Sequence, residues 1–183
     1  MPKIIYLFMG KRKSGKDYIA DLLESALKEK GENVRVVRLS SPIKKIYAER
    51  HDLDYEKLLS ASDYKEKYRA DMIEWSEELR NLDYGFFCRH AIPNEEEDND
   101  KLIWIVSDCR RQTDIDFFEY NFPDIVRVRI KASEKTRQSR GFVFQKGIDD
   151  AESECGLDDF DGVDVEINND NTPDISQLVN RVK

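Results

Sequence analysis

The chain has 183 residues, of which 39% are hydrophobic and 37% are charged, and its formal net charge is −8. This length predicts a single domain over residues 1–183 with a substantial core. The acidic balance argues against a nucleic-acid binder, which is normally basic. No apolar run approaches the ~20 residues of a membrane span, so we expect no membrane segment. Anionic ligands would have to be attracted by local basic clusters.

The cysteines predict no metal site and no disulfide framework. Cys88, Cys109 and Cys155 are odd in number, widely spaced and without a CxxC pair. Reduced thiols are typical of the cytosol. The first predicted strand begins near Lys3, which leaves no room for a targeting peptide. We therefore expect a cytosolic protein.

The first forty residues predict a β-α-β unit. The apolar run from Ile4 to Met9 is typical of a strand buried on both faces. A helix is expected next, capped at Gly31, because apolar residues recur at helical spacing: Ile19, Leu22, Leu23, Ala26 and Leu27. A second strand is expected at 34–39. Such a unit implies a right-handed crossover in a parallel sheet.

The rest of the chain predicts more of the same architecture. A helical section is expected from about 42 to 82, followed by an acidic surface loop at 94–100. A short helix is expected after Pro173. Three further strands are expected, at 103–106, 125–130 and 163–167. The predicted fold class is therefore α/β, with a five-stranded parallel sheet and helices on both faces.

The turn after the first strand carries the clearest motif. It matches G-x-x-x-x-G-K, with Asp17 where Ser or Thr is usual, and reads Gly10-Lys11-Arg12-Lys13-Ser14-Gly15-Lys16. The two glycines let the backbone wrap around phosphates with its N–H groups inward, and the following helix adds its positive N-terminal end. Lys16 would reach the β- and γ-phosphates. Because a buried strand precedes the turn and an amphipathic helix follows it, we expect nucleotide binding.

Two carboxylates are candidate ligands of Mg²⁺. Asp17 is a hard oxygen ligand that would hold the ion directly or through a water, although it would also favour the positive first turn of a helix. Asp108 follows Ser107 at the end of the third strand, where the acidic residue of P-loop enzymes helps to hold Mg²⁺.

Basic residues exceed what nucleotide binding alone requires. Lys11, Arg12 and Lys13 add three cations to the loop, which favours a second anionic ligand nearby, although a solvated loop tip would also explain them. The helix predicted at 62–82 carries an apolar stripe, namely Tyr64, Tyr68, Met72, Trp75 and Leu79. Beside it runs a basic stripe, namely Lys65, Arg69 and Arg80. A helix that lines an anion-filled cleft would show such a basic stripe, and so would a helix exposed to solvent.

Arginines follow the third strand and alternate along the fourth. Arg110 and Arg111 are placed to grip a carboxylate or phosphate with bidentate guanidinium groups. Arg127 and Arg129 alternate with valines, and we expect at least one of them to point toward the active cleft, because charges in a buried strand need partners.

A second arginine pair precedes the acid-rich stretch 141–156. Arg137 and Arg140 beside such a stretch are typical of a lid that closes over ATP, excludes water and stabilises charge. An ordinary charged helix end would look the same.

Five segments in order resemble the animal-type phosphomevalonate kinases, within the nucleoside-monophosphate-kinase-like P-loop group. They span nearly the whole chain: 10–17, Arg-x-Asp-Met-Ile-x-Trp at 69–75, Gly-Phe-Phe-Cys-Arg at 85–89, Val-Ser-Asp-x-Arg-Arg at 106–111, and Asp-Asp-Ala-Glu-Ser-Glu-Cys-Gly-Leu-Asp at 149–158. The resemblance implies a three-layer P-loop kinase fold with an acceptor-binding helical region at about 42–92 and a mobile lid at about 133–156. It also implies transfer of the ATP γ-phosphoryl group to (R)-5-phosphomevalonate with Mg²⁺, giving 5-diphosphomevalonate and ADP, a step toward isoprenoids and sterols.

The resemblance also assigns roles by position. ATP would be bound by Gly10, Lys11, Arg12, Lys13, Ser14, Gly15, Lys16, Asp17, Arg137, Arg140 and Asn169. Catalytic roles would fall to Lys16, Arg12, Lys13, Arg111 and Arg140. The acceptor would be bound by Lys44, Lys65, Arg69, Arg80, Arg89, Arg110, Arg111 and Arg127. Mg²⁺ would be held by Asp17 and Asp108, and we expect a monomer.

Two departures and two rival functions remain. Asp170 stands where the family has His, which bears on the adenine side, and the insert at 94–100 is longer than usual. A nucleoside-monophosphate kinase would need an aromatic or apolar slot for its base, whereas this sequence supplies repeated cations. A nucleotide-dependent switch is disfavoured by the arginine-bearing lid and by the lack of an Asn-Lys-x-Asp motif.

Overall fold

The structure is a computed structural model that describes residues 1–60, 63–93 and 102–182. These residues divide into two compact units, which we call the sheet unit (Met1–Val37 with Pro93–Lys183) and the helical unit (Arg38–Ile92). The predicted acidic loop at 94–100 lies outside the described residues. The helical unit nearly coincides with the acceptor-binding region expected at 42–92, and the single domain over 1–183 stays a prediction.

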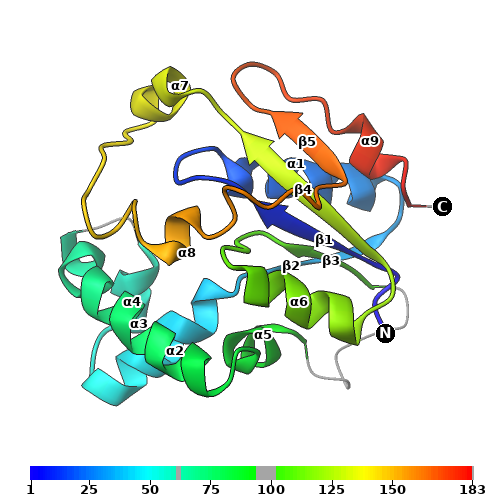
Figure 1. The fold of residues 1–183 in the computed structure, drawn as a ribbon. Helices are drawn as coiled ribbons and strands as arrows, with labels where there is room; N and C mark the ends of the chain where they lie inside the picture. The colour runs from blue at the N-terminus through cyan, green and yellow to red at the C-terminus, as the bar shows by residue number, and fades with distance from the viewer. Residues whose placement is uncertain (61–62, 94–101, 183) are drawn as a thin grey trace. The chain divides into compact units, whose positions relative to one another are not determined.

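The sheet unit is built on five parallel strands (Figure 1). In chain order they are β1 Ile4–Met9, β2 Asn33–Val37, β3 Leu102–Val106, β4 Ile125–Lys131 and β5 Val165–Asn168. Their order across the sheet is β2-β3-β1-β4-β5, and every pairing is parallel. The predicted α/β fold with a five-stranded parallel sheet is confirmed.

The first strand lies at the centre of the sheet. Leu7 pairs with Val106 of β3 on one side and with Arg127 of β4 on the other. The five residues from Ile5 to Met9 are fully buried, which explains their continuous apolar run. The turn that follows Met9 therefore begins in the middle of the carboxyl edge, where open α/β sheets bind their ligands.

Helix α1 (Lys16–Glu29) covers one face of the sheet. Its buried stripe of Ile19, Leu23 and Leu27 packs in the same core cluster as Tyr6 of β1. Gly31 follows the C-cap residue of the helix, and its φ of 82° allows a Schellman motif. In this motif the Gly31 N–H donates to the Lys28 carbonyl and the Glu32 N–H donates to the Leu27 carbonyl. The predicted helix and its glycine cap are both confirmed.

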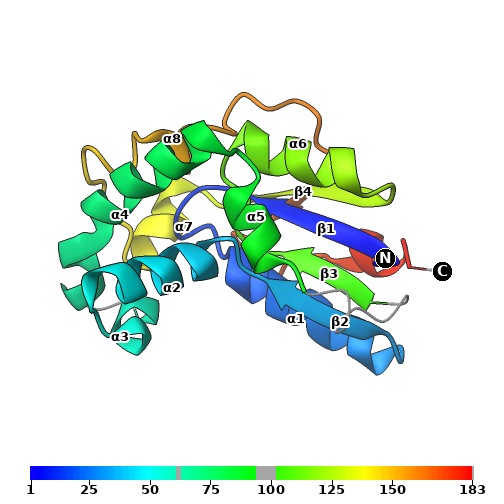
Figure 2. The ribbon, with the colours of Figure 1, turned by 90° about the horizontal axis from the view of Figure 1, so that it is seen from below.

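Helix α6 (Gln112–Asn121) covers the opposite face, so helices lie on both faces as predicted (Figure 2). This helix was not expected from the sequence. Its start is fixed by the buried carboxylate of Asp114, whose Oδ2 accepts the backbone N–H groups of Arg110 and Arg111 at 3.0 and 3.1 Å.

Three short helices complete the sheet unit. They are α7 Glu134–Ser139, α8 Glu152–Cys155 and α9 Ser176–Val179, the last being the C-terminal helix predicted after Pro173. Helix α9 packs beside α1, and the buried Tyr6 hydroxyl donates to the Leu178 carbonyl at 2.8 Å. This bond joins the central strand to the last helix.

The helical unit contains α2 Ser40–His51, α3 Tyr55–Leu59, α4 Asp63–Leu82 and α5 Phe86–Ala91. Its core gathers Tyr47, Ala48, Leu58 and Met72, with Tyr64, Tyr68 and Trp75 packed against them, which confirms most of the apolar stripe predicted on α4. The second strand was predicted to reach Leu39 but ends at Val37, because α2 begins at Ser40. No helix within the described ranges is long and apolar enough to cross a membrane.

Candidate active site

The turn between β1 and α1 has a backbone conformation that needs glycine. Gly10 and Gly15 have φ values of 146° and 93°, and Lys13 between them is also left-handed at 64°. A side chain at Gly10 would clash with the Ile130 carbonyl oxygen of β4, and one at Gly15 would clash with the Asn169 amide. The two glycines therefore let the loop lie tightly against its neighbours.

Lys16 opens α1 and lies beneath this turn. Its Nζ donates to the Gly10 and Lys11 carbonyls at 2.5 and 3.1 Å, and the residue is only 9% exposed. Burial, followed by the positive charge of Arg110, lowers the pKa of Lys16 to about 8, although nearby carboxylates oppose the shift. With this pKa, Lys16 loses its charge at a lower pH than a free lysine does, and a bound anion would favour its charged form.

A network from two other segments holds the far side of the turn. The Arg140 guanidinium donates to the Ser14 carbonyl at 3.0 Å and to the Asn169 carbonyl at 2.6 Å. The Asn169 amide, 2% exposed, donates to the same Ser14 carbonyl at 2.9 Å. Arg140 and Asn169, both expected near ATP, therefore contact the loop through its backbone.

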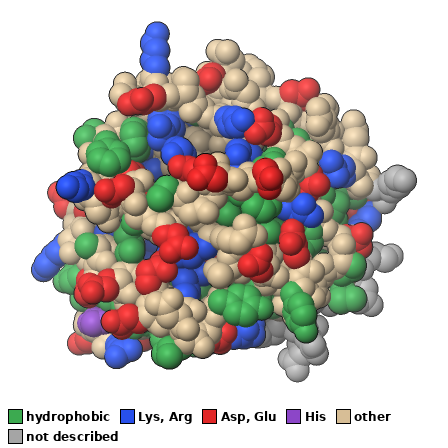
Figure 3. Space-filling view, viewed as in Figure 1, with side chains coloured by type: hydrophobic (Ala, Val, Ile, Leu, Met, Phe, Trp, Pro, Cys, Tyr) green, Lys and Arg blue, Asp and Glu red, His purple; other side chains and the backbone are tan. Residues whose placement is uncertain are grey.

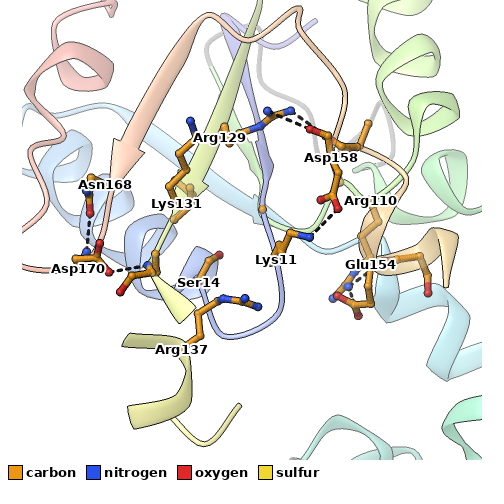
Figure 4. Close-up of a pocket in the computed structure, with 17 residues that line it drawn as sticks. Lys11, Ser14, Arg110, Arg129, Lys131, Arg137, Glu154, Asp158, Asn168 and Asp170 are labelled. Atoms are coloured by element: carbon orange, nitrogen blue, oxygen red, sulfur yellow. Dashed lines mark hydrogen bonds and ion pairs between the residues drawn. The ribbon is translucent and has the colours of Figure 1, made fainter. Parts of the chain in front are cut away.

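A cavity of about 600 Å³ adjoins the turn at the carboxyl edge of the sheet (Figure 4). All its lining residues belong to the sheet unit. They are Gly10, Lys11, Ser14, Cys109, Arg110, Arg129, Ile130, Lys131, Ala132, Ser133, Arg137, Ser153, Glu154, Leu157, Asp158, Asn168 and Asp170. Five of them, Lys11, Arg110, Arg129, Lys131 and Arg137, are cations, which suits a polyanionic ligand.

Carboxylates of residues 154 and 158 pair with the cavity's cations. Lys11 Nζ lies 2.6 Å from the Asp158 carboxylate, and Arg110 is ion-paired with Glu154 (Figure 4). Arg110 also donates to the Ser153 carbonyl at 3.1 Å. Burial acts to lower the pKa of Arg110, but Glu154 and Asp108 outweigh it, so the net shift is upward.

Arg12 contacts the segment that follows α7. Its Nη2 donates to the Val143 carbonyl at 2.6 Å and to the Asp149 carboxylate at 2.8 Å. Its guanidinium also lies over the Phe142 ring, 5.3 Å from the centroid, and the Arg137 guanidinium lies 4.3 Å from the same centroid. The two arginines expected on the loop and the lid thus share one aromatic ring.

Of the two arginines on β4, Arg129 lines the cavity. It donates to the Leu157 and Phe160 carbonyls at 2.8 and 2.6 Å and so holds the loop that carries Asp158 (Figure 4). Arg127, the residue assigned to the acceptor, is not among the lining residues. It pairs with Glu119 at 2.9 Å and donates to the Gly162 carbonyl, and its acceptor role stays a prediction.

Two of the remaining assignments in the sheet unit, Asp17 and Asp108, lie close to Lys16. Asp17 is in the first turn of α1 and Asp108 follows β3, and both carboxylates raise the pKa of Lys16. Arg111 is 5% exposed, and burial lowers its pKa against the opposing charge of Asp114.

No cluster of three or more potential metal ligands occurs in the described part of the chain. Two aspartates still fit Mg²⁺, which usually takes one or two carboxylates together with substrate phosphates and water.

The other five acceptor assignments belong to the helical unit. Arg69 pairs with Glu66 at 3.0 Å, Arg89 is ion-paired with Asp83, and Arg80, 6% exposed, lies 5.2 Å from the Phe87 ring centroid. Lys44 lies 3.5 Å from the Ser40 hydroxyl, and Lys65 is on α4. The basic stripe of α4 therefore includes one buried cation, and its acceptor role stays a prediction.

Several residues at the cavity had no assigned role. Lys131, Glu154 and Asp158 line it, and Asp149 reaches Arg12 from a segment 137 residues away. The resemblance to 149–158 marked this stretch as part of the family pattern, but its carboxylates carried no function. The sequence signal for these carboxylates is the acid-rich segment itself. Acidic side chains beside a site that binds anions need basic partners within the protein.

A lysine buried beneath a glycine-bounded turn, beside a cavity lined by cations, is suited to a nucleoside triphosphate, and the fold with this site is that of a P-loop phosphotransferase. The family model for phosphomevalonate kinase matches residues 8–124. The chain is also 45% identical over 173 residues to a phosphomevalonate kinase of Drosophila melanogaster, covering 93% of this chain and 89% of that protein. The chain belongs to the phosphomevalonate kinase family.

A solved structure shows a similar fold. TT1252 from Thermus thermophilus superposes with a TM-score of 0.55 at 14% sequence identity, over 99% of this chain and 94% of that one. Family membership makes the chain an ATP-dependent phosphotransferase with a small-molecule substrate.

Proposed function

We propose that this enzyme transfers the γ-phosphoryl group of ATP to (R)-5-phosphomevalonate, giving ADP and 5-diphosphomevalonate, a step toward isoprenoids and sterols. Membership of the family supports this acceptor. The observation that carries the proposal is the turn that buries Lys16 beside the cation-lined cavity. Repeated cations suit an acceptor with a carboxylate and a phosphate, whereas a nucleoside monophosphate would need a slot for its base.

The loop would bind the triphosphate. Backbone N–H groups from Gly10 to Asp17 and the N-terminal end of α1 would surround the phosphates, while Lys16, Arg12 and Lys13 neutralise their charge. Asp17 and Asp108 would hold Mg²⁺. That ion, when bound, neutralises charge on the β- and γ-phosphates.

The acceptor needs positioning more than activation. Its phosphate oxygen is already anionic, so no strong general base is required. Arg110, which lines the cavity, and the buried Arg111 would orient the acceptor, and the family resemblance adds Arg127 and the helical unit's Lys44, Lys65, Arg69, Arg80 and Arg89.

The stretch 133–156 would act as the lid. Arg137 lines the cavity and Arg140 contacts the loop backbone, so closing this stretch would exclude water and add positive charge where it develops. Asn169 would hold the loop from its far side. We expect the enzyme to work as a cytosolic monomer.

An ADP-release assay tests the proposed function. The purified chain is given ATP and Mg²⁺ with phosphomevalonate, AMP, CMP or no acceptor. Turnover with phosphomevalonate alone is the expected result. Turnover with AMP or CMP would indicate a nucleoside-monophosphate kinase, and equal ADP release without acceptor would indicate a hydrolysing switch.

Variants in the same assay test the assigned residues. Lys16→Met and Asp17→Ala should each lower kcat by about 10²-fold or more, because the first removes a positive charge at the phosphates and the second removes an expected ligand of Mg²⁺. Lys28→Met, which removes an exposed lysine of the same helix, is the matched control and should leave kcat unchanged. Arg111→Ala should chiefly raise the acceptor KM. Near-normal kcat in the first two variants would reject the site.

A further inference from the structure

Among the described residues, the Arg12 side chain makes its hydrogen bonds and its ring contact with one short segment of the same unit. The Val143 carbonyl, the Asp149 carboxylate and the Phe142 ring all lie within residues 142–149. The pair with Asp149 is largely shielded, since the two side chains are 17% and 6% exposed. Such a pair keeps a more defined geometry than the exposed pair of Lys11 and Asp158.

The Asp149 carboxylate binds both Arg12 and the backbone of its own segment. Its Oδ2 accepts from Arg12 and also from the Gln145 backbone N–H at 2.8 Å. Gly141 precedes the segment and Gly147 lies within it, and their φ values of 80° and 82° are left-handed, as turns at these positions require. Asp149 therefore shapes the segment and attaches it to the P-loop with the same oxygen.

The segment leads directly to the cavity through Phe142. The Phe142 N–H donates to the Arg137 carbonyl at 2.9 Å, and the Arg137 guanidinium lies over the Phe142 ring. Arg137 lines the cavity, whereas Arg12 does not. Arg137 is thus linked to the pair of Arg12 and Asp149 through the Phe142 ring that both arginines contact.

We infer that Asp149 is a positioning residue for phosphoryl transfer. It attaches the segment after α7 to Arg12 of the P-loop and so fixes Arg137 at the cavity. This role rests on the proposed function, but the attachment itself exists without any substrate. Asp149 is not among the residues that line the cavity, and it acts through two arginines.

Hydrogen exchange of the ligand-free protein tests the attachment without any assumption about the acceptor. Arg12→Ala should speed exchange in peptides that cover 142–149, and Asp149→Asn should do the same, because each removes one partner of the contact. Lys13→Ala removes a neighbouring exposed charge of the same loop and should leave these peptides unchanged. Unchanged exchange in Arg12→Ala would overturn the inference.

Kinetics test the catalytic role. Asp149→Asn should lower kcat about 10- to 100-fold, as expected for a misplaced charged group. ATP KM should change less, since the loop and Lys16 still bind the triphosphate. Asp150→Asn removes the same charge from an exposed neighbour that accepts the Gly147 N–H, and its kcat should stay near that of the wild type.

A double-mutant cycle separates positioning from a general structural effect. If Asp149 acts through Arg12, the double variant Arg12→Ala/Asp149→Asn should be no slower than Arg12→Ala alone. Losses that multiply in the double variant would overturn the proposal. A wild-type enzyme inactive toward phosphomevalonate would instead reject the proposed function, and the exchange result would still stand.

Discussion

Lys16 shows how the fold prepares one side chain for an anion. The lysine is buried and bound to two carbonyls, and burial lowers its pKa to about 8, well below the 10.5 of a free lysine. A nearby phosphate would favour the charged form and raise that pKa again. Binding and protonation of Lys16 should therefore be coupled.

This coupling predicts proton uptake when ATP binds. At pH 8.5 a large fraction of the ligand-free protein has neutral Lys16, so binding should take up part of a proton, whereas near pH 6.5 Lys16 is already charged and its uptake should vanish. Calorimetry in two buffers with different protonation enthalpies measures the uptake. Lys16→Met should remove the pH-dependent part, and an equal uptake in that variant would assign it to another group.

At the scale of elements, the strands and the P-loop followed from local patterns. Continuous apolar runs predicted the buried strands, and the spacing of two glycines and a lysine predicted the loop, because both depend on neighbouring residues. Helix α6 was missed because its buried face includes the charged Asp114 beside Ile115, Phe117 and Phe118, which interrupts the short apolar pattern.

The contacts of the site could be predicted less well. Arg127 and Arg129 are equivalent in the alternation of β4, and only the carbonyls of residues 157–160 place Arg129 at the cavity. The contact of Arg12 with Asp149 joins residues 137 positions apart. Neither depends on local sequence; both depend on how distant loops meet at the edge of the sheet.

The link between β1 and α9 gives a stability prediction. Tyr6→Phe removes the buried hydrogen bond to the Leu178 carbonyl and leaves that acceptor buried, which should lower the free energy of unfolding by about 1–3 kcal/mol. Burial also raises the pKa of Tyr6 to about 12, which agrees with a neutral hydroxyl donor. Urea denaturation should show a lower midpoint at unchanged slope. Tyr18→Phe, at a 52% exposed tyrosine, is the control, and equal midpoints for both variants would contradict the prediction.

At the scale of the whole molecule, an acidic protein binds anions by gathering its cations locally. The chain has 38 acidic and 30 basic residues, and Figure 3 shows both signs interleaved over the face drawn there. At the cavity, the carboxylates of Asp158 and Glu154 pair with Lys11 and Arg110. The net charge of the protein is therefore a poor indicator of the charge of its ligand, and the positions of the basic residues are a better one.

The surface predicts a monomer. Among the described residues, the large exposed hydrophobic side chains come from separate stretches of the chain, such as Leu82, Tyr120 and Phe144. A net charge of −8 also disfavours self-association. Light scattering after size exclusion should give a mass near 21.5 kDa with and without ATP. About twice that value would indicate a dimer.

Gly10 approaches the Ile130 carbonyl closely, so positions 10 and 130 should differ in how many amino acids they tolerate. Ile130 shapes the loop with its backbone oxygen, which every amino acid possesses, so valine or leucine should be accepted there. Position 10 has no such freedom, because any β-carbon would collide with that oxygen. In a saturation library, selection for growth should keep one residue at position 10 and several at position 130.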